Sequence, residues 1–278
     1  MKALYDQLSV CCSKKTTQLY STSFSLGIHF LQPKFHSPIY SIYGFVRLAD
    51  EIVDSFHGYD KHGLMAKIRQ DTAEAIAAGI SINPILNSFQ HVVNQYGIEW
   101  SLIDTFLKSM EMDLGQKQHS PDSFQEYVLG SAEVVGLMCL RVFTEGDAAQ
   151  YEDLRYYAMK LGAAFQKVNF LRDLKADYQD LGRSYFPGIN FTHFTIADKD
   201  IIQQQIQQDF EQALIGIKRL PASSRRGVYL AYYYYQKLFL RISQTPAEKV
   251  MDARIRIPNH NKIGLMLRSL IRHQLNML

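Results

Sequence analysis

The segment SPIYSIYGFVRLADEIVDSF, residues 37–56, decides the fold expected for this chain. Apolar side chains cover most of its helical circumference, and a helix that is hydrophobic nearly all round belongs inside a protein. Yet Tyr43, Arg47, Asp50 and Asp54 follow at spacings of four, three and four, which places them on one stripe within ~60° of arc. Two carboxylates one turn apart repel, and burying them unpaired costs more than such a helix gains. A cationic partner is therefore expected at this stripe.

A second apolar helix repeats the arrangement in LGAAFQKVNFLRDLKADYQDLGR, residues 161–183. Gln166, Asn169, Asp173 and Asp177 follow there at spacings of three, four and four. Two buried acidic stripes are reconciled if they face each other across a cavity that holds metal ions. Oxygen ligands that include a carboxamide, with no His or Cys nearby, suit Mg²⁺, and Mn²⁺ could take its place.

These residues resemble the motifs of the squalene/phytoene synthases, a family of all-helical head-to-head prenyl transferases. The family pattern has a Tyr, an Arg and a DxxxD on one helix, and QxxNxxRDxxxD on another. It also has an SxSF element, here at residues 21–24, and a GRxYxP element, here at residues 182–187. The resemblance extends from Tyr20 to about Lys262 and is strongest to bacterial phytoene synthases. The helical motif residues are Tyr43, Arg47, Asp50, Asp54, Gln166, Asn169, Arg172, Asp173 and Asp177.

The resemblance implies an all-α fold, with one domain over residues 1–278 and an isoprenoid-synthase-type helical bundle around a central cavity. It implies Mg²⁺-dependent condensation of two geranylgeranyl diphosphates to phytoene, through a cyclopropyl (prephytoene) diphosphate and without NADPH. The implied metal ligands are Asp50, Asp54, Asn169, Asp173 and Asp177. The implied substrate-binding residues are Ser21, Ser23, Tyr43, Arg47, Tyr127, Gln166, Arg172 and Arg183, and the implied catalytic residues are Tyr43, Arg47 and Tyr185.

The sequence departs from the family pattern at a few positions. Glu51 stands where the family usually has a second Asp, and Lys175 and Ala176 replace a small-acidic pair. Glu51 lies ~100° round the helix from Asp50, which favours an outer-shell role over direct ligation. A basic element near the family's active site corresponds to Arg254 and Arg256, but a tyrosine that often contacts the diphosphate there has no clear match.

Several other features admit both a packing and a functional interpretation. The small residues of Gly130–Gly136 and Gly162–Ala164 allow either close helix packing or room for a ligand. Ser21 and Ser23 could cap a helix, hold a diphosphate at its start, or do both. The consecutive tyrosines 232–235 go round a helix, which predicts packing for most of them.

Three local expectations concern the elements around the two stripes. Asp113 lies on a predicted helix after Trp100, and a surface position is the interpretation we favour over a place in the acidic cavity. Pro33 to Pro38 is predicted to form a turn before the first acidic helix. A helix is also predicted to open at Asp147 and to carry the second stripe.

Composition excludes several other classes. The chain has 278 residues, 47% hydrophobic and 21% charged, so general disorder is excluded. A net charge of +3, with no Lys/Arg run among aromatics, predicts no nucleic-acid partner. Three cysteines without metal or disulfide spacing suit a reducing cytoplasm, and no run approaches 18 apolar residues. The basic amphipathic end, residues 253–278, is expected to pack on the body and could also contact an anionic membrane.

Three alternative functions follow from the same residues. Squalene or dehydrosqualene synthesis would use farnesyl diphosphate, with NADPH for squalene. The absence of a GxGxxG fingerprint argues only weakly against NADPH, because the family's reductases lack one too. A terpene cyclase would place its acids in a different motif order. A non-catalytic relative acting as an assembly factor would lose stripe acids, and here Asp50, Asp54, Asp173 and Asp177 are all present.

Overall fold

The computed structural model describes residues 1–115, 118–180, 182–189, 191–250 and 255. Within these ranges the chain is helical and has no strand; its only β-type pairing there is an isolated bridge between Gln118 and Ser184. The all-α fold predicted from the sequence is confirmed.

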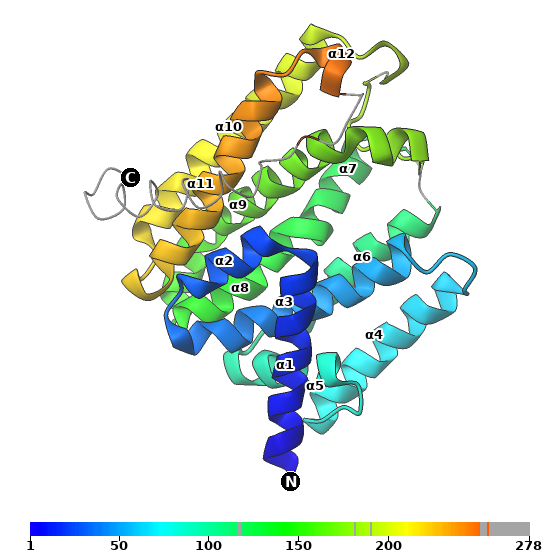
Figure 1. Cartoon of the computed structure of the whole chain (residues 1–278). Helices are drawn as coiled ribbons and strands as arrows, with labels where there is room; N and C mark the ends of the chain where they lie inside the picture. The colour runs from blue at the N-terminus through cyan, green and yellow to red at the C-terminus, as the bar shows by residue number, and fades with distance from the viewer. Residues whose placement is uncertain (116–117, 181, 190, 251–254, 256–278) are drawn as a thin grey trace.

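The elements follow one another with short connections (Figure 1). The N-terminal helices are α1 (Lys2–Tyr20), α2 (Thr22–His29), α3 (Pro33–Asp54), α4 (Lys61–Ala78), α5 (Pro84–Tyr96) and α6 (Trp100–Gly115). Next come α7 (Pro121–Val128), the π-helical η1 (Leu129–Glu133), α8 (Val134–Thr144), α9 (Ala148–Lys175), the π-helical η2 (Ala176–Asp180) and the 3₁₀ turn η3 (Phe191–His193). The last described helices are α10 (Ile196–Arg219), α11 (Ala222–Ser243) and α12 (Ala247–Val250).

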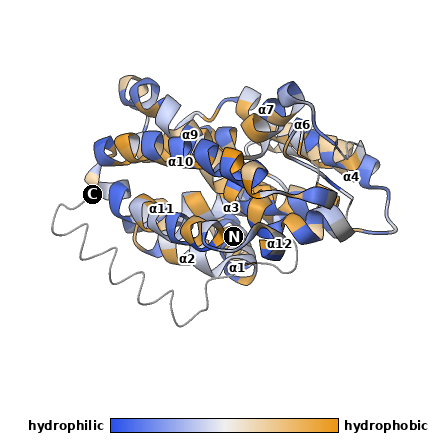
Figure 2. Cartoon of the chain, turned by 90° about the horizontal axis from the view of Figure 1, so that it is seen from above, coloured by the Kyte–Doolittle hydropathy of each residue, from blue (hydrophilic) through white to orange (hydrophobic). Residues whose placement is uncertain are grey.

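The long helix α9 organises one side of the bundle. It packs against α8, η1, α10 and α11, and Figure 1 shows α10 and α11 beside it. On the other side α1 crosses α3 and α5, while α4 packs on α5 and α6. Figure 2 shows hydrophobic and hydrophilic residues along single helices, the amphipathic pattern that directs one face of each helix inward.

Two hydrophobic cores form between these layers. The first is built mainly from helices α2–α6 and α8, and it includes Phe45, whose ring stacks on Phe89 at 4.0 Å between centroids. The second is built from α7 and α9–α12 together with the loop after η2, and includes the fully buried Phe210. Helix α3 therefore belongs to one core and the second half of α9 to the other.

The start of α3 corrects one expectation. The predicted turn from Pro33 to Pro38 is wrong, because α3 already begins at Pro33 and contains Pro38. Pro33 occupies the first helical turn, where its missing N–H costs nothing and its fixed φ suits a helix. Pro38 lies early in the helix, so few backbone bonds are lost. The helix predicted to open at Asp147 is confirmed, since the Asp147 side chain accepts from the Gln150 N–H.

The small residues serve first to bring helices together. A Cβ built at Gly130 would overlap the Ser109 side chain, and one built at Gly162 would lie 2.5 Å from the Ala132 carbonyl oxygen. A Cβ at Gly136 would lie 2.8 Å from the Ala158 carbonyl oxygen. Helix η1 thus approaches both α6 and α9, and α8 approaches α9, so closely that only glycine fits at these crossings.

By length and composition alone, the helical stretch Pro121–Thr144 could cross a membrane. Within its most apolar 18-residue window, 56% of the residues are buried inside the protein, where η1 packs between α6 and α9. The core helix of a soluble protein passes the same test, so the stretch is weak evidence for a span.

Replacing Gly162 with Ala should lower the free energy of unfolding by about 1–3 kcal/mol, because the added methyl group forces η1 and α9 apart. Gly27→Ala is the matched control in another buried helix, since its Cβ would meet ordinary contacts at 3.7 Å. Urea unfolding of the ligand-free proteins measures both. Equal stability of Gly162→Ala and the parent protein would contradict the close crossing.

Candidate active site

One cavity of about 660 Å³ lies between the two cores. Acidic and basic side chains gather at one end, and apolar side chains line the rest. Both acidic stripes face this cavity, as the sequence analysis predicted. Of the predicted site residues, the cavity is lined by Ser21, Tyr43, Arg47, Asp50, Asp54, Tyr127, Gln166, Asn169, Arg172, Asp173, Asp177, Arg183 and Tyr185. Ser23 is not among its lining residues, so its substrate-binding role stays a prediction.

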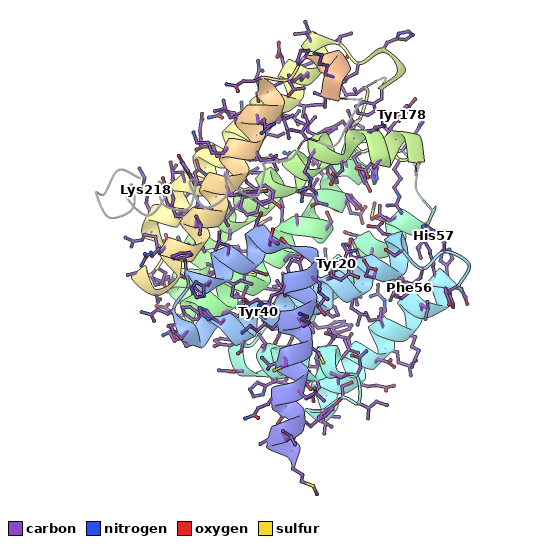
Figure 3. The ribbon with its side chains drawn as sticks, viewed as in Figure 1. Tyr20, Tyr40, Phe56, His57, Tyr178 and Lys218 are labelled. Carbon is purple, nitrogen blue, oxygen red and sulfur yellow. The ribbon has the colours of Figure 1, made fainter. Side chains whose placement is uncertain are left out.

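The first stripe is held by an arginine on the same helix. Arg47 pairs with Asp50 one turn later and also with Glu51. Its guanidinium lies 4.2 Å from the centroid of the Tyr20 ring, a cation–π contact with the end of α1 (Figure 3 labels Tyr20). Glu51 thus faces Arg47, in agreement with the expectation that it is displaced from the ligating stripe.

The Asp50 carboxylate keeps an unfavourable electrostatic environment despite this pairing. Burial, and then the nearby Asp54 carboxylate, raise the pKa of Asp50 to about 6. Its side chain still has 36% of its surface accessible, because the carboxylate opens onto the cavity. The α3 stripe is therefore short of positive charge.

The second stripe runs off the end of α9. The Arg172 Nε donates to Asp173 at 3.1 Å, and the two side chains form an ion pair. Asp177 lies one turn on, but in η2, so the single α-helix predicted through it is wrong. The wider π turn still keeps both carboxylates on one face, and the Arg183 N–H donates to the Asp177 carbonyl at 2.7 Å. Burial, and then Asp173, raise the pKa of Asp177 to about 7.

Arg183 connects the two stripes. Gly182, at φ +67°, turns the chain after η2 and directs the following residue back toward the cavity. The Arg183 guanidinium donates to Asp54 Oδ1 at 3.1 Å and to the Asp113 carbonyl oxygen at 3.1 Å. The Arg183 side chain therefore pairs with a carboxylate of α3, while its main-chain N–H donates to the Asp177 carbonyl of η2.

The donor chemistry of this end suits a divalent cation. Its ligand atoms are carboxylate and carboxamide oxygens, the set that Mg²⁺ prefers. Among the described residues, no three His, Cys, Asp or Glu side chains lie close enough to form a ready-made metal cluster. The raised pKa values of Asp50 and Asp177 show carboxylates that still lack positive charge. The residues therefore fit a site in which carboxylates of both helices would supply some of the ligands of each cation and a negatively charged ligand would supply the others.

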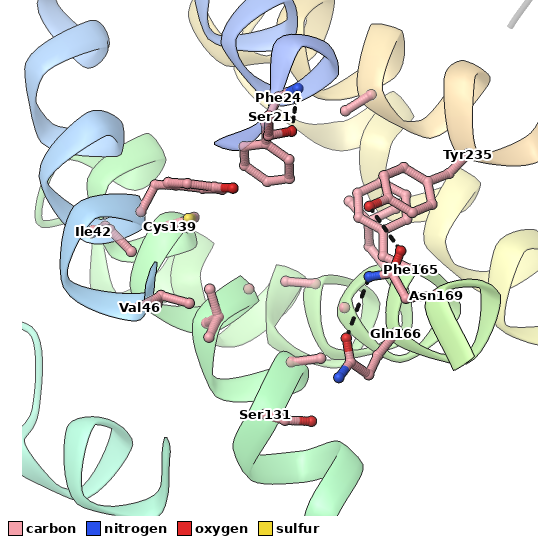
Figure 4. Close-up of a pocket in the computed structure, with 18 of the residues that line it drawn as sticks. Ser21, Phe24, Ile42, Val46, Ser131, Cys139, Phe165, Gln166, Asn169 and Tyr235 are labelled. Carbon is pink, nitrogen blue, oxygen red and sulfur yellow. Dashed lines mark hydrogen bonds between the residues drawn. The ribbon is translucent and has the colours of Figure 1, made fainter. Parts of the chain in front are cut away.

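Asn169 has a partner that the sequence analysis missed. The Tyr235 hydroxyl donates to Asn169 Oδ1 at 3.2 Å, and the Tyr235 ring stacks on Phe165 at 4.0 Å (Figure 4). The Asn169 amide in turn donates to Gln166 Oε1 at 3.5 Å. Packing was predicted for most of residues 232–235, and Tyr232 and Tyr233 are indeed buried in the second core. Tyr235 is positioned by its hydrogen bond to Asn169 of α9, a partner that the periodicity of α11 does not reveal.

Asp113 is the second residue that the sequence analysis misplaced. The expected surface position is wrong, because Asp113 lines the cavity beside Asp54. The Tyr127 hydroxyl donates to its Oδ2 at 2.6 Å. Burial raises the pKa of Asp113 to about 7. The hydrophobic spacing of α6 indicated only that Asp113 lies next to the apolar face of this helix. Its place in the cavity depends on contacts with α7 and with the loop after η2, which the spacing does not reveal.

The serine-rich element begins α2 at the mouth of the cavity. Ser21 caps this helix by accepting from the Phe24 N–H at 3.2 Å, and both Ser21 and Tyr43 line the cavity. Burial raises the pKa of Tyr43 to about 12, and the Phe24 ring lies 5.4 Å from the Tyr43 ring. Ser21 therefore has the capping role; its second predicted role, in diphosphate binding, stays open.

Away from the carboxylates and arginines, the cavity is lined by apolar and aromatic side chains. Figure 4 shows Phe24, Ile42, Val46 and Phe165 around this space. Among the small residues, Ala132, Gly136 and Gly162 both line it and form the close helix crossings, so the two interpretations hold together. Ala164 is fully buried and does not line the cavity.

Two expectations fall outside the described residues. They are the basic element with Arg254 and Arg256, and the basic amphipathic end of the chain, of which only Ile255 is described.

The helices thus enclose an apolar cavity with an acidic, arginine-rich end. A profile of the squalene/phytoene synthase family matches residues 17–261. The chain belongs to the squalene/phytoene synthase family.

Similar sequences and structures agree with this family. The chain is 25% identical to a chloroplastic phytoene synthase from Narcissus pseudonarcissus, over 86% of this chain and 59% of that protein. It is 30% identical to a presqualene diphosphate synthase from Sinorhizobium fredii, over 64% of this chain and 63% of that protein. The chain therefore spans less than two thirds of either relative's length. A dehydrosqualene synthase structure shares the fold with a TM-score of 0.84 at 20% identity, and covers 98% of both chains.

The ligand-free protein should lose stability as the pH rises from about 4 to about 7. The folded-state pKa values of Asp50, Asp113 and Asp177 lie above the ordinary value of 3.8. In this window the folded state therefore binds more protons than the unfolded state, and the free energy of unfolding falls with rising pH. Asp177→Asn should flatten this dependence in urea unfolding, whereas Asp122→Asn, at an exposed carboxylate, should not. An unchanged slope in Asp177→Asn would contradict the electrostatic interpretation.

Proposed function

We propose that this protein condenses two geranylgeranyl diphosphates head to head into phytoene, through a cyclopropyl diphosphate, in a Mg²⁺-dependent reaction that needs no NADPH. One observation carries this proposal. Two acidic stripes, on α3 and on α9 with η2, face one cavity whose other end is apolar. The first end suits a diphosphate with its cations, and the second suits a hydrocarbon chain.

The residues that would hold Mg²⁺, or Mn²⁺ in its place, are Asp50, Asp54, Asn169, Asp173 and Asp177. Bound there, the metal would neutralise diphosphate charge and so make the diphosphate a better leaving group.

Arginines supply the other half of the binding chemistry. Arg47, Arg172 and Arg183 line the cavity and now pair with Asp50, Asp173 and Asp54 respectively. Guanidinium groups bind phosphate oxygens in the same planar, two-pronged way as carboxylates. The same side chains can therefore hold the diphosphate once its cations satisfy the carboxylates. Gln166 adds an amide at this end.

The apolar end protects a carbocation. Loss of diphosphate leaves an allylic cation, which water would quench in an open site. The rings of Phe24, Tyr43, Phe165 and Tyr235 line the cavity beside its polar end. Aromatic faces attract cations, so these rings can stabilise the charge without reacting with it. Tyr43 and Tyr185 are the tyrosines that the family motif implies for ionisation or proton loss.

Two considerations favour the C20 substrate. Several relatives, from Narcissus and elsewhere, are phytoene synthases, although the identity to them is only about a quarter. Each extra buried CH₂ contributes ~0.8 kcal/mol where room exists, which favours the longer chain. The reducing cytoplasmic setting and weak peripheral membrane contact expected from the sequence complete the proposal.

Incubation with farnesyl and geranylgeranyl diphosphate, each with Mg²⁺ and with or without NADPH, tests the proposal. Identification of the hydrocarbon by mass spectrometry should show phytoene from geranylgeranyl diphosphate, without NADPH. Squalene from farnesyl diphosphate with NADPH would support the squalene alternative, and dehydrosqualene without NADPH would support the dehydrosqualene alternative. No turnover of either substrate would support a non-catalytic role.

Asp54→Asn and Asp173→Asn should each lower kcat by at least about 10²-fold, because each removes one charge from the site that neutralises the diphosphate. Both variants should retain the fold, since they remove one of two repelling carboxylates. Asp153→Asn, at an exposed ion pair with Arg219, is the control and should keep full activity. Full activity in either stripe variant would refute the metal assignment.

Ala132→Phe should shift preference toward farnesyl diphosphate, because a ring at this position fills cavity space near the middle of η1. The sequence alone suggested Ala164 equally, but Ala164 does not line the cavity, so Ala132 is the informative site. Ala132→Ser, which keeps the volume small, is the matched control. The ratio of kcat/KM for the two substrates measures the shift, and an unchanged ratio would show that chain length is set elsewhere.

A further inference from the structure

A carboxylate that accepts hydrogen bonds from two tyrosines lies beside the acidic stripes. It belongs to neither of the two DxxxD motifs. Asp113 comes from α6, Tyr127 from α7 and Tyr185 from the loop after η2, and all three line the cavity. The Tyr127 hydroxyl donates to Asp113 Oδ2 at 2.6 Å, and the Tyr185 hydroxyl donates to Asp113 Oδ1 at 3.4 Å. Each carboxylate oxygen thus accepts a phenolic O–H.

The surroundings hold this group rigidly. The Tyr127 and Tyr185 rings stack with centroids 5.1 Å apart, and Tyr185 stacks on Phe170 at 4.1 Å. The His119 ring lies 5.0 Å from Tyr127 and 5.6 Å from Tyr185. Arg183 donates to the backbone carbonyl of Asp113, which fixes the main chain beneath the carboxylate. Side chains that are packed and bonded in this way are suited to a positioning role.

The direction of these hydrogen bonds decides what the tyrosines can do. Because each O–H points at Asp113, the phenolic oxygens can present their lone pairs toward the cavity. In this state the hydroxyls are acceptors and cannot donate to a leaving diphosphate. Burial also raises the pKa of Asp113 to about 7, so its carboxylate is a stronger base than one on the surface.

The proposed reaction needs a proton acceptor twice. Two R–CH₂–diphosphate molecules give R–CH=CH–R, two diphosphates and two protons. In the first half-reaction one diphosphate leaves, a carbon–carbon bond forms and one C1 proton is lost as the cyclopropane closes. In the second half-reaction the other diphosphate leaves and a second C1 proton is lost as the double bond forms. Each lost proton leaves its C–H electron pair in the new bond.

We propose that Asp113 is the positioning residue that makes Tyr127 and Tyr185 the acceptors of these protons; the inference rests on the proposed function. The proton passes from C1 to a tyrosine oxygen while that tyrosine's own O–H proton moves to Asp113. The tyrosine is unchanged at the end of the step and Asp113 is neutral. Diphosphate or water then takes the proton from Asp113 before the next step.

Asp113→Asn provides the central test, because the amide keeps the shape but cannot take up the proton. It can also donate to a tyrosine oxygen, which removes the acceptor geometry. With geranylgeranyl diphosphate, kcat should fall by about 10²–10⁴-fold, while KM should change less than about threefold. The primary isotope effect with substrate dideuterated at C1 should rise above that of the parent protein, since proton loss becomes rate-limiting. Asp113→Glu should restore part of kcat.

Tyr127→Phe and Tyr185→Phe extend the test, and remain informative if Asp113→Asn does not fold. At least one of them should show the same raised isotope effect. Circular dichroism and binding of a non-hydrolysable prenyl diphosphate analogue check each variant's fold and substrate site. A lower kcat with an unchanged isotope effect, or a loss seen only in KM, would overturn the inference. Absence of turnover by the parent protein would instead overturn the proposed function, and the inference with it.

Discussion

Repulsion between carboxylates inside an apolar frame is the constraint on which the rest of this structure depends. Asp50 and Asp54 lie one turn apart on α3, and Asp173 and Asp177 lie one turn apart across α9 and η2. Arginines of both helices offset part of this charge, but the raised pKa values of Asp50 and Asp177 show that the offset is incomplete. The ligand-free protein is therefore short of positive charge at this end of the cavity, and in the proposed function a bound cation would supply it.

Packing in the two hydrophobic cores offsets the free-energy cost of holding these carboxylates close together. Each acidic stripe is carried by a helix whose other faces are packed in a core, α3 in the first core and α9 largely in the second. The glycine crossings between α9, η1 and α8 hold the cavity wall together at backbone contact distance. Rigid walls matter, because acids on flexible segments would move apart and relieve their own repulsion. Close packing thus maintains the electrostatic deficit.

Much of the fold and the first layer of the site could be predicted from the sequence, because both follow helical periodicity. The stripe residues share a face by spacing alone, and the structure places them around one cavity. Asp113 and Tyr235 could not be predicted in this way. Their partners, Tyr127 and Asn169, lie on other helices, and only tertiary packing sets that register. The π turn at Asp177 was missed for a related reason, since the turn at Gly182 and the bond from the Arg183 N–H to the Asp177 carbonyl shape it.

In the proposed function the polar end of the cavity would accept an anion and later release it, and the arginine pairs offer a physical basis for both steps. Arg47, Arg172 and Arg183 have carboxylate partners when no ligand is bound, so none is a bare, desolvated cation. In the proposed function, a diphosphate that arrives with its cations would exchange partners: the cations would take the carboxylates and the guanidiniums would take the phosphate oxygens. When the product diphosphate leaves, the original pairs would re-form and offset the cost of losing it. Such an exchange would keep the difference in free energy between the bound and free states small although each interaction is strong, as a site that must turn over requires.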